Sequence, residues 1–111
     1  MEMLVLGVGG SFSAHEYSTS MLLTHEGAGL LIDCPHPIAK MLHEAQSSHP
    51  ELDFQWRDLA GLVLTHLHAD HCSGVEGLAY HHKYVLGSRI PLGIHPRVGA
   101  SLWENLSLIH I

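Results

Sequence analysis

Residues 66–71, HLHADH, bring three histidines and one aspartate into six positions, directly after the apolar run 59–64. That run is too apolar to alternate between a buried and an exposed face, so we predict a strand covered on both faces. In an extended segment, residues i and i+2 point to the same side. His66 and His68 can therefore reach one metal ion together from the end of this strand.

The other two polar residues of the segment extend the predicted site. We expect Asp70 to continue the extended alternation as the chain turns, so that its side chain points to the same side as His66 and His68. We expect His71 to break this alternation and to point to a different place. The segment can then offer two nitrogens to one ion, and a carboxylate and a nitrogen to a second ion nearby. Imidazole and carboxylate suit zinc, iron or manganese. The alternative is a polar loop rich in histidine by chance, because the chain has 12 histidines.

Apolar runs and turn residues predict the order three strands, helix, strand, helix, strand, helix. The predicted strands are 3–8, 18–24, 29–32, 59–64 and 90–94. The predicted helices are 37–46, 74–86 and 96–106. The chain is 46% hydrophobic and 14% charged, which allows a packed core and argues against disorder. We find neither an internal repeat nor a linker, so we expect one domain or part of one.

Composition excludes several classes of protein. A net charge of −6 argues against a broad nucleic-acid-binding face, but it does not exclude a local basic pocket. Two cysteines are too few for a disulfide scaffold, and no apolar run is long enough to cross a membrane. We therefore expect a cytoplasmic protein without membrane contact. The glycine loop 7–10 is only a partial dinucleotide motif, since Phe12 stands where the last glycine belongs.

Most of the remaining histidines are interpreted as solvent-exposed or locally hydrogen-bonded. His81 and His82 are adjacent within a predicted helix, so they point in different directions and are interpreted as surface residues. For His15 and His36, which follow strand ends, the alternative is that they line a cleft. Cys72 is interpreted as a small packing residue.

Residues 65–74, THLHADHCSG, resemble the His-x-His-x-Asp-His signature of the metallo-β-lactamase superfamily. The glycine loop 7–10, residues 18–20 (STS) and residues 31–34 (LIDC) resemble the amino-terminal half of its ribonuclease Z-like members. The resemblance implies an α/β fold, namely the first half of an αββα sandwich with a mixed β-sheet covered by helices on one face. It also implies a metal site at the strand ends.

The resemblance implies a role for each motif residue. His66 and His68 would bind the first metal ion, and Asp70 and His71 the second, with Zn²⁺ favoured at both sites and manganese or iron as alternatives. Asp70 would also be catalytic by facing a bridging water. Asp33 would lie outside the ligand set and orient a ligand histidine. A strand-end cap is the alternative role for Asp33.

The activity that this resemblance implies is dinuclear metal-dependent hydrolysis, most of all phosphodiester cleavage of the ribonuclease Z kind. The substrate would be a small molecule or a nucleic acid, and the intact protein could be a homodimer. A thioester hydrolase of the glyoxalase II kind is the first alternative, and a non-catalytic metal-binding protein the second. A diiron oxidoreductase fits less well, because that branch typically has glutamate where this chain has His68.

The chain departs from the family after the signature. Members supply further histidine and aspartate ligands there, and none of the later histidines sits in a matching context; these are His81, His82, His95 and His110. We therefore expect residues 1–105 to be a truncated first half of the domain. Residues 106–111, LSLIHI, match a translated frame of a transposon-end sequencing adapter and are expected to be foreign. By itself, this chain is expected to be inactive.

Overall fold

Strands and helices follow one another in the predicted order in the computed structural model, which describes residues 1–52 and 54–105. The strands are β1 (Glu2–Gly7), β2 (Ser20–His25), β3 (Ala28–Ile32), β4 (Leu59–Val63) and β5 (Leu92–Gly93). The helices are α1 (Ile38–Ser48), the 3₁₀ turn η1 (Trp56–Asp58), α2 (Ala69–Cys72), α3 (Val75–Tyr80), the π-helical η2 (His81–Leu86) and α4 (Pro96–Asn105). The tail 106–111 lies outside the described residues, so its predicted foreign origin stays a prediction.

All five strands form one mixed sheet in the order β1-β2-β3-β4-β5. The first three strands pair antiparallel, and β3, β4 and β5 pair parallel. Glu26 and Gly27 form the two-residue turn between β2 and β3 with φ of 50° and 81°. Positive φ at both turn residues is typical of the turn whose twist matches a β-hairpin.

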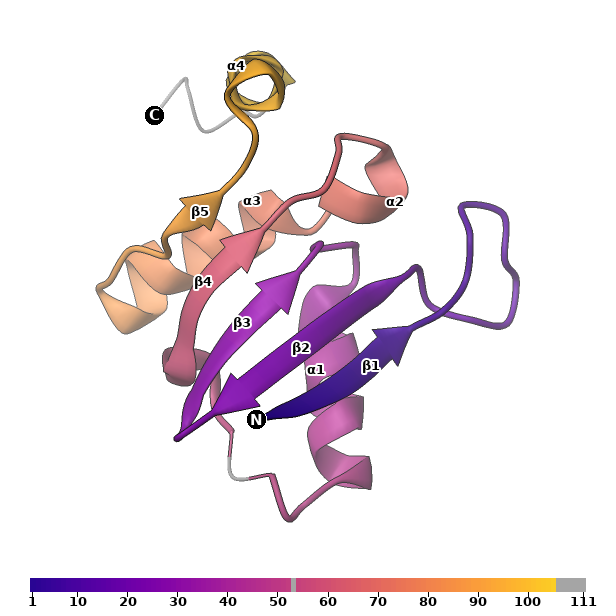
Figure 1. Ribbon diagram of the computed structural model, residues 1–111, viewed down its shortest axis with the longest axis vertical. Coiled ribbons are helices and arrows are strands. Elements are labelled where there is room, and N and C mark those ends of the chain that lie inside the picture. The colour runs from indigo at the N-terminus through magenta and orange to yellow at the C-terminus, as the bar shows by residue number, and fades with distance from the viewer. Residues whose placement is uncertain (53, 106–111) are drawn as a thin grey trace.

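One face of the sheet is covered by helices, as Figure 1 shows for α1 and α3 behind the strands. Leucines that pair across the strands point to this covered face; they are Leu4, Leu22, Leu31 and Leu62. Leu22, Leu31 and Leu62 are at most 2% exposed, and they share a core with Met41 and Leu42 of α1 and Leu78 of α3. The amphipathic spacing of Ile38, Met41 and Leu42 explains why α1 lies on the sheet.

The opposite face, which we call the open sheet face, is also apolar. Its residues alternate with the buried leucines; they are Met3, Val5, Met21, Leu23, Leu30, Ile32 and Val63. Met3 and Val5 are 59% and 48% exposed, and Val63 is partly buried. The second cover expected for strand 59–64 is therefore not supplied by residues 1–52 or 54–105.

Candidate functional site

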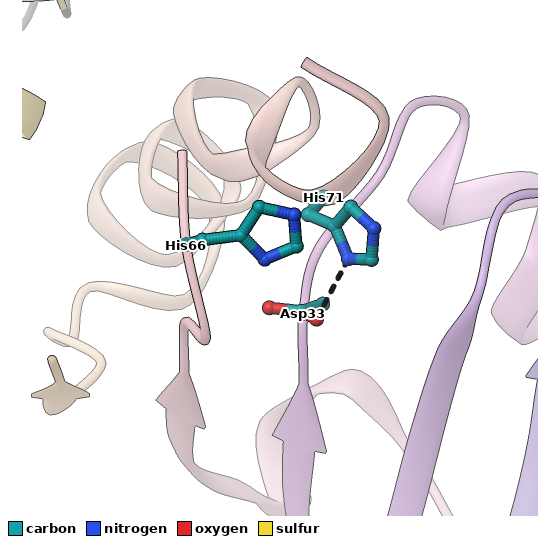
Figure 2. Close-up of side chains that lie close together, drawn as sticks. All are labelled: Asp33, His66 and His71. Carbon is teal, nitrogen blue, oxygen red and sulfur yellow. Dashed lines mark hydrogen bonds and ion pairs between the residues drawn. The ribbon is translucent and has the colours of Figure 1, made fainter. Parts of the chain in front are cut away.

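The motif lies at the carboxyl end of β4, next to the end of β3. Ile32 and Val63 are the last paired residues of these parallel strands, so the segments that follow β3 and β4 leave the sheet side by side. Figure 2 shows Asp33, which follows β3, beneath the rings of His66 and His71, which follow β4. Parallel pairing thus joins residues that lie more than thirty positions apart.

Asp33 is fixed by its backbone. Its φ of 61° lies in the left-handed region, which aspartate tolerates better than most residues. Its amide donates to the Val63 carbonyl over 2.8 Å, and its carbonyl accepts from the Ser20 hydroxyl over 3.0 Å. The residue is 5% exposed, so its carboxylate has one well-defined position.

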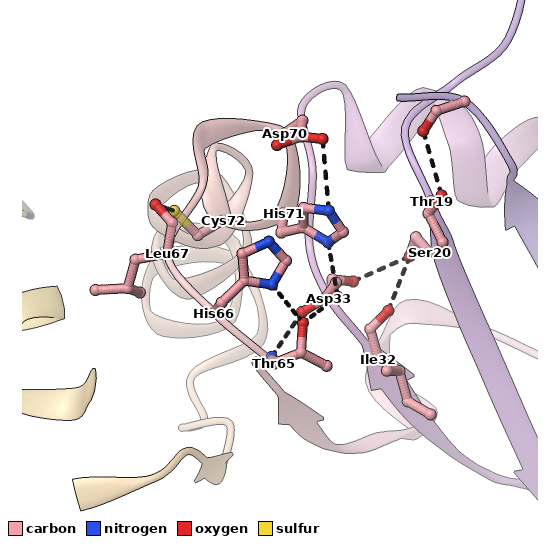
Figure 3. A network of polar contacts seen from close by, with 11 residues as sticks. Thr19, Ser20, Ile32, Asp33, Thr65, His66, Leu67, Asp70, His71 and Cys72 are labelled. Carbon is pink, nitrogen blue, oxygen red and sulfur yellow. Dashed lines mark hydrogen bonds and ion pairs between the residues drawn. The ribbon is translucent and has the colours of Figure 1, made fainter. Parts of the chain in front are cut away.

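The Asp33 carboxylate accepts three hydrogen bonds (Figure 3). Oδ1 accepts from the Thr65 amide over 2.8 Å, and Oδ2 accepts from the Thr65 hydroxyl over 2.7 Å. Oδ2 also lies 2.8 Å from Nδ1 of His71. A buried carboxylate must be satisfied in this way, because an unpaired charge away from water is strongly unfavourable.

The structure brings the four predicted ligand residues together. The rings of His66 and His71 are 4.1 Å apart between centroids, and those of His66 and His68 are 4.7 Å apart. Oδ2 of Asp70 lies 3.4 Å from Nε2 of His71. His68 is exposed, whereas the other three are partly buried.

Two expectations are wrong here, namely that Asp70 continues the extended alternation and that His71 points to a different place from His66. The chain turns into α2 at once, with the His71 amide donating to the His68 carbonyl over 2.8 Å. Helical winding returns the His71 ring towards His66, where an extended chain would have carried it elsewhere. The two predicted ligand pairs therefore form one cluster.

Backbone hydrogen bonds tie α2 to the segment that follows β3. The Cys34 amide donates to the His71 carbonyl, and the Gly74 amide donates to the Cys34 carbonyl, each over 2.8 Å. A Cβ on Gly74 would clash with the Pro35 carbonyl oxygen. Glycine is therefore required for this close approach, which holds the end of α2 against the segment that follows Asp33.

Both thiols lie next to the cluster and are shielded. Burial raises the pKa of Cys34, and the nearby Cys72 and Asp33 raise it further. Burial also raises the pKa of Cys72, together with Asp33 and Asp70. Only a thiolate is a good metal ligand or nucleophile, so both cysteines act in packing at neutral pH.

The donor set fits a divalent metal ion. Asp33, His66 and His71 each offer a ligand atom, and these atoms all lie within 4.8 Å of one another. The side chains of Asp33 and Asp70 are only 7% and 14% exposed, and among the described residues each forms an ion pair with His71. Two shielded carboxylates facing one imidazole leave a negative charge that a cation would compensate.

The histidines outside the motif do not join the cluster. The surface assignment of His82 is wrong, because it is 2% exposed and its Nδ1 lies 3.1 Å from the Leu78 carbonyl. Leu78 is fully buried, and a residue four positions later lies on the same side of a helix. His15 and His36 are exposed, and His95 contacts the Arg97 amide at the start of α4. No described helix is long and apolar enough to cross a membrane.

Solved structures identify the fold class. Human tRNase Z, short form, matches with a TM-score of 0.70 and 24% identity over 99% of this chain and 41% of that chain. A diphosphatase from the PhnP family matches with a TM-score of 0.72 and 20% identity over 96% and 46% of the two chains. The chain therefore has the metallo-β-lactamase fold, and the predicted α/β half-sandwich is confirmed.

Sequence comparison identifies the family within that fold. The family model of Anti-Pycsar protein Apyc1 matches residues 1–108. The chain belongs to the Anti-Pycsar protein Apyc1 family. A protein of that name from Bacillus phage BSP38 is 41% identical over 103 residues, which are 91% of this chain and 38% of the relative. Another, from Paenibacillus xerothermodurans, is 30% identical over 105 residues, or 95% and 39%. The chain thus spans about two fifths of the length of these relatives.

Two predictions made from the motif are wrong, namely the branch of the superfamily and the activity. The family is Apyc1 and not the ribonuclease Z-like branch, whose resemblance shows only the shared fold. The predicted ribonuclease Z-like cleavage, with its glyoxalase II-like and non-catalytic alternatives, is likewise replaced by the anti-Pycsar assignment of the relatives.

Sequence reasoning gave no role to Thr65, although its hydroxyl contacts both Asp33 and His66. Its position immediately before the first motif histidine was the available signal. The contact with Asp33 depends on strand pairing and could not be read from spacing.

Proposed function

We propose that the whole protein is a metal-dependent hydrolase that opens the cyclic phosphodiester of a small nucleotide, and so acts against Pycsar as the names of its relatives indicate. The observation that carries this proposal is the cluster of His66, His68, Asp70 and His71 beside the buried Asp33, in a chain of the Apyc1 family. Membership of the Apyc1 family supports a cyclic nucleotide over RNA as the substrate class, whereas the likeness to tRNase Z extends only to the fold.

The proposed ligands of the metal are His66, His68, Asp70 and His71, with zinc favoured. Imidazole and carboxylate are the donors that zinc, manganese and iron share. When bound, such an ion supplies Lewis acidity towards a phosphoryl oxygen and acidifies water.

The described residues prepare these ligands. Asp33 accepts a hydrogen bond from Nδ1 of His71 over 2.8 Å, which directs Nε2 of that ring towards Oδ2 of Asp70, 3.4 Å away. Because both oxygens of Asp33 already accept hydrogen bonds, its role is to orient His71 and not to bind the ion directly. Asp70 has one carboxylate oxygen close to His71, so the two can share an ion.

The test uses the whole protein and the four 3′,5′-cyclic mononucleotides, with zinc or manganese supplied. We expect at least one of them to be hydrolysed to the linear monophosphate, measured by chromatography. His68→Ala should reduce turnover by more than the roughly 10–100-fold that loss of an orienting partner causes. His25→Ala, which changes an exposed histidine of the β2–β3 hairpin, is the matched control and should leave turnover unchanged.

The proposal is wrong if none of the four nucleotides is hydrolysed with either metal. It is also wrong if His68→Ala turns over as fast as His25→Ala, because the activity would then not depend on this cluster.

A further inference from the structure

Thr65 lies between the Asp33 carboxylate and the ring of His66 (Figure 3). Its Oγ1 is 2.7 Å from Oδ2 of Asp33 and 2.9 Å from Nδ1 of His66. The hydroxyl therefore makes two hydrogen bonds, one on each side.

The direction of these two bonds follows from proton count. A hydroxyl has one proton to donate, and an ionised carboxylate can only accept. The Thr65 proton therefore goes to Asp33, and its oxygen must accept from His66. That requires the proton of the neutral His66 ring to sit on Nδ1, which leaves the lone pair on Nε2.

The same carboxylate sets the second ring. Nδ1 of His71 lies 2.8 Å from Oδ2 of Asp33 and must donate to it, so the lone pair of the neutral His71 ring is also on Nε2. One buried carboxylate thus determines the tautomers of two histidines, directly for His71 and through a hydroxyl for His66.

We propose that Thr65 is a positioning residue, which holds His66 in the Nδ1–H tautomer and so presents Nε2 to a metal ion. This inference rests on the proposed metal site, but it concerns the metal-free protein as well. Partners of this kind fix the ring and raise the basicity of a ligand nitrogen.

A purely structural role for Thr65 can be separated from this one. Its backbone amide donates to Oδ1 of Asp33 over 2.8 Å, and that bond is independent of the side chain. Thr65→Val keeps this bond and the shape of the side chain but removes the hydroxyl. Thr65→Ser keeps the hydroxyl and should rescue. Thr19→Val is the matched control, because the Thr19 hydroxyl donates to the Gly9 carbonyl over 3.2 Å and makes no hydrogen bond to a histidine within residues 1–52 or 54–105.

The first measurement is the tautomer of each histidine in the metal-free whole protein above pH 8, by long-range ¹H–¹⁵N correlation. We expect Nδ1–H for His66 and His71 in the unmodified protein. In Thr65→Val, His66 should shift towards the Nε2–H tautomer while His71 keeps Nδ1–H. An Nε2–H tautomer of His66 in the unmodified protein overturns the proposal, even if Thr65→Val does not fold.

The second measurement is zinc affinity, by competition with a chromophoric chelator. We expect Thr65→Val to lower affinity by roughly 10–100-fold, and Thr65→Ser and Thr19→Val to change it by less than about 3-fold. Equal affinities for Thr65→Val and Thr19→Val would refute the role.

Neither readout depends on turnover. If no cyclic nucleotide is hydrolysed but the tautomers and zinc affinities behave as expected, the proposed function fails and the role of Thr65 stands. If hydrolysis is found but the tautomer of His66 is insensitive to Thr65→Val, only the inference about Thr65 fails.

Discussion

Replacing Gly74 by alanine tests whether close backbone packing holds the candidate site together. Gly74 joins α2 to α3, and its amide donates to the Cys34 carbonyl over 2.8 Å. An added Cβ would clash with the Pro35 carbonyl oxygen and lie 3.1 Å from the Cys34 carbonyl oxygen. Neither contact is with a flexible side chain, so the backbone itself must move.

The expected magnitude follows from comparison with Gly77 in the same helical region. Forcing an extra carbon into a packed site typically costs about 1–3 kcal/mol. A Cβ on Gly77 would meet nothing within 4 Å, so Gly77→Ala should stabilise α3 by about 0.5–1 kcal/mol through helix propensity. The two variants should therefore differ by about 1.5–4 kcal/mol in the free energy of unfolding.

Urea denaturation of the whole protein measures this difference, and zinc affinity measures its effect on the site. The Gly74 amide donates to the Cys34 carbonyl, and the Cys34 amide donates to the His71 carbonyl, so displacement of Gly74 should also weaken zinc binding. Gly77→Ala should leave zinc affinity unchanged. If Gly74→Ala is as stable as Gly77→Ala and binds zinc equally well, the packing account of this junction is refuted.

Three further predictions concern the buried carboxylate, the buried thiol and the open sheet face. Asp33→Asn tolerates the same left-handed φ but has a single acceptor oxygen. It cannot accept from the Thr65 amide at one position and from the Thr65 hydroxyl and His71 at the other, so urea denaturation should show a loss of about 2–4 kcal/mol. Asp58→Asn, which changes a partly buried capping carboxylate, should lose less than about 0.5 kcal/mol. The raised pKa of Cys34 means that the folded protein keeps a proton which the unfolded chain releases, so stability should fall as the pH rises above about 8.5, by up to roughly 1.4 kcal/mol per pH unit. A Cys34→Ala variant that keeps the full slope would contradict this cause. The 111-residue chain alone should self-associate through its open sheet face, and Val5→Glu should reduce that association in light scattering; an unmodified chain that is already monodisperse would argue against it.

Apolar periodicity was sufficient to predict most of the strands and the main helix, whereas their arrangement in a mixed sheet came from the family resemblance. The leucine-rich runs of β2, β3 and β4 are hydrophobic enough to identify as strands without knowledge of their neighbours. β5 keeps only Leu92 and Gly93 of the predicted 90–94, and both are exposed, so the pattern there was weak. The π-helical winding of η2 within the predicted helix 74–86 has no counterpart in hydrophobic spacing.

The candidate site was only partly predictable, because two of its features are non-local. The spacing of His66, His68, Asp70 and His71 marked the segment, but its helical turn at α2 depends on the bonds that tie it to Cys34. Asp33 reaches the cluster because β3 and β4 pair in parallel. Neither interaction leaves a trace in local sequence spacing, and both determine the orientation of the His71 ring.

The error about function has a chemical origin. A metal ion held by such ligands acts on a phosphoryl or acyl centre, and one or the other of these centres occurs in many different substrates. Side chains away from the ion distinguish RNA from a cyclic nucleotide, because both carry a phosphodiester and the parts that differ lie away from the reacting phosphorus. The four motif residues can therefore be the same in enzymes that act on different substrates. Similarity over residues 1–108 includes the surroundings of the motif as well, which is why it separates the Apyc1 family from proteins that share only the fold.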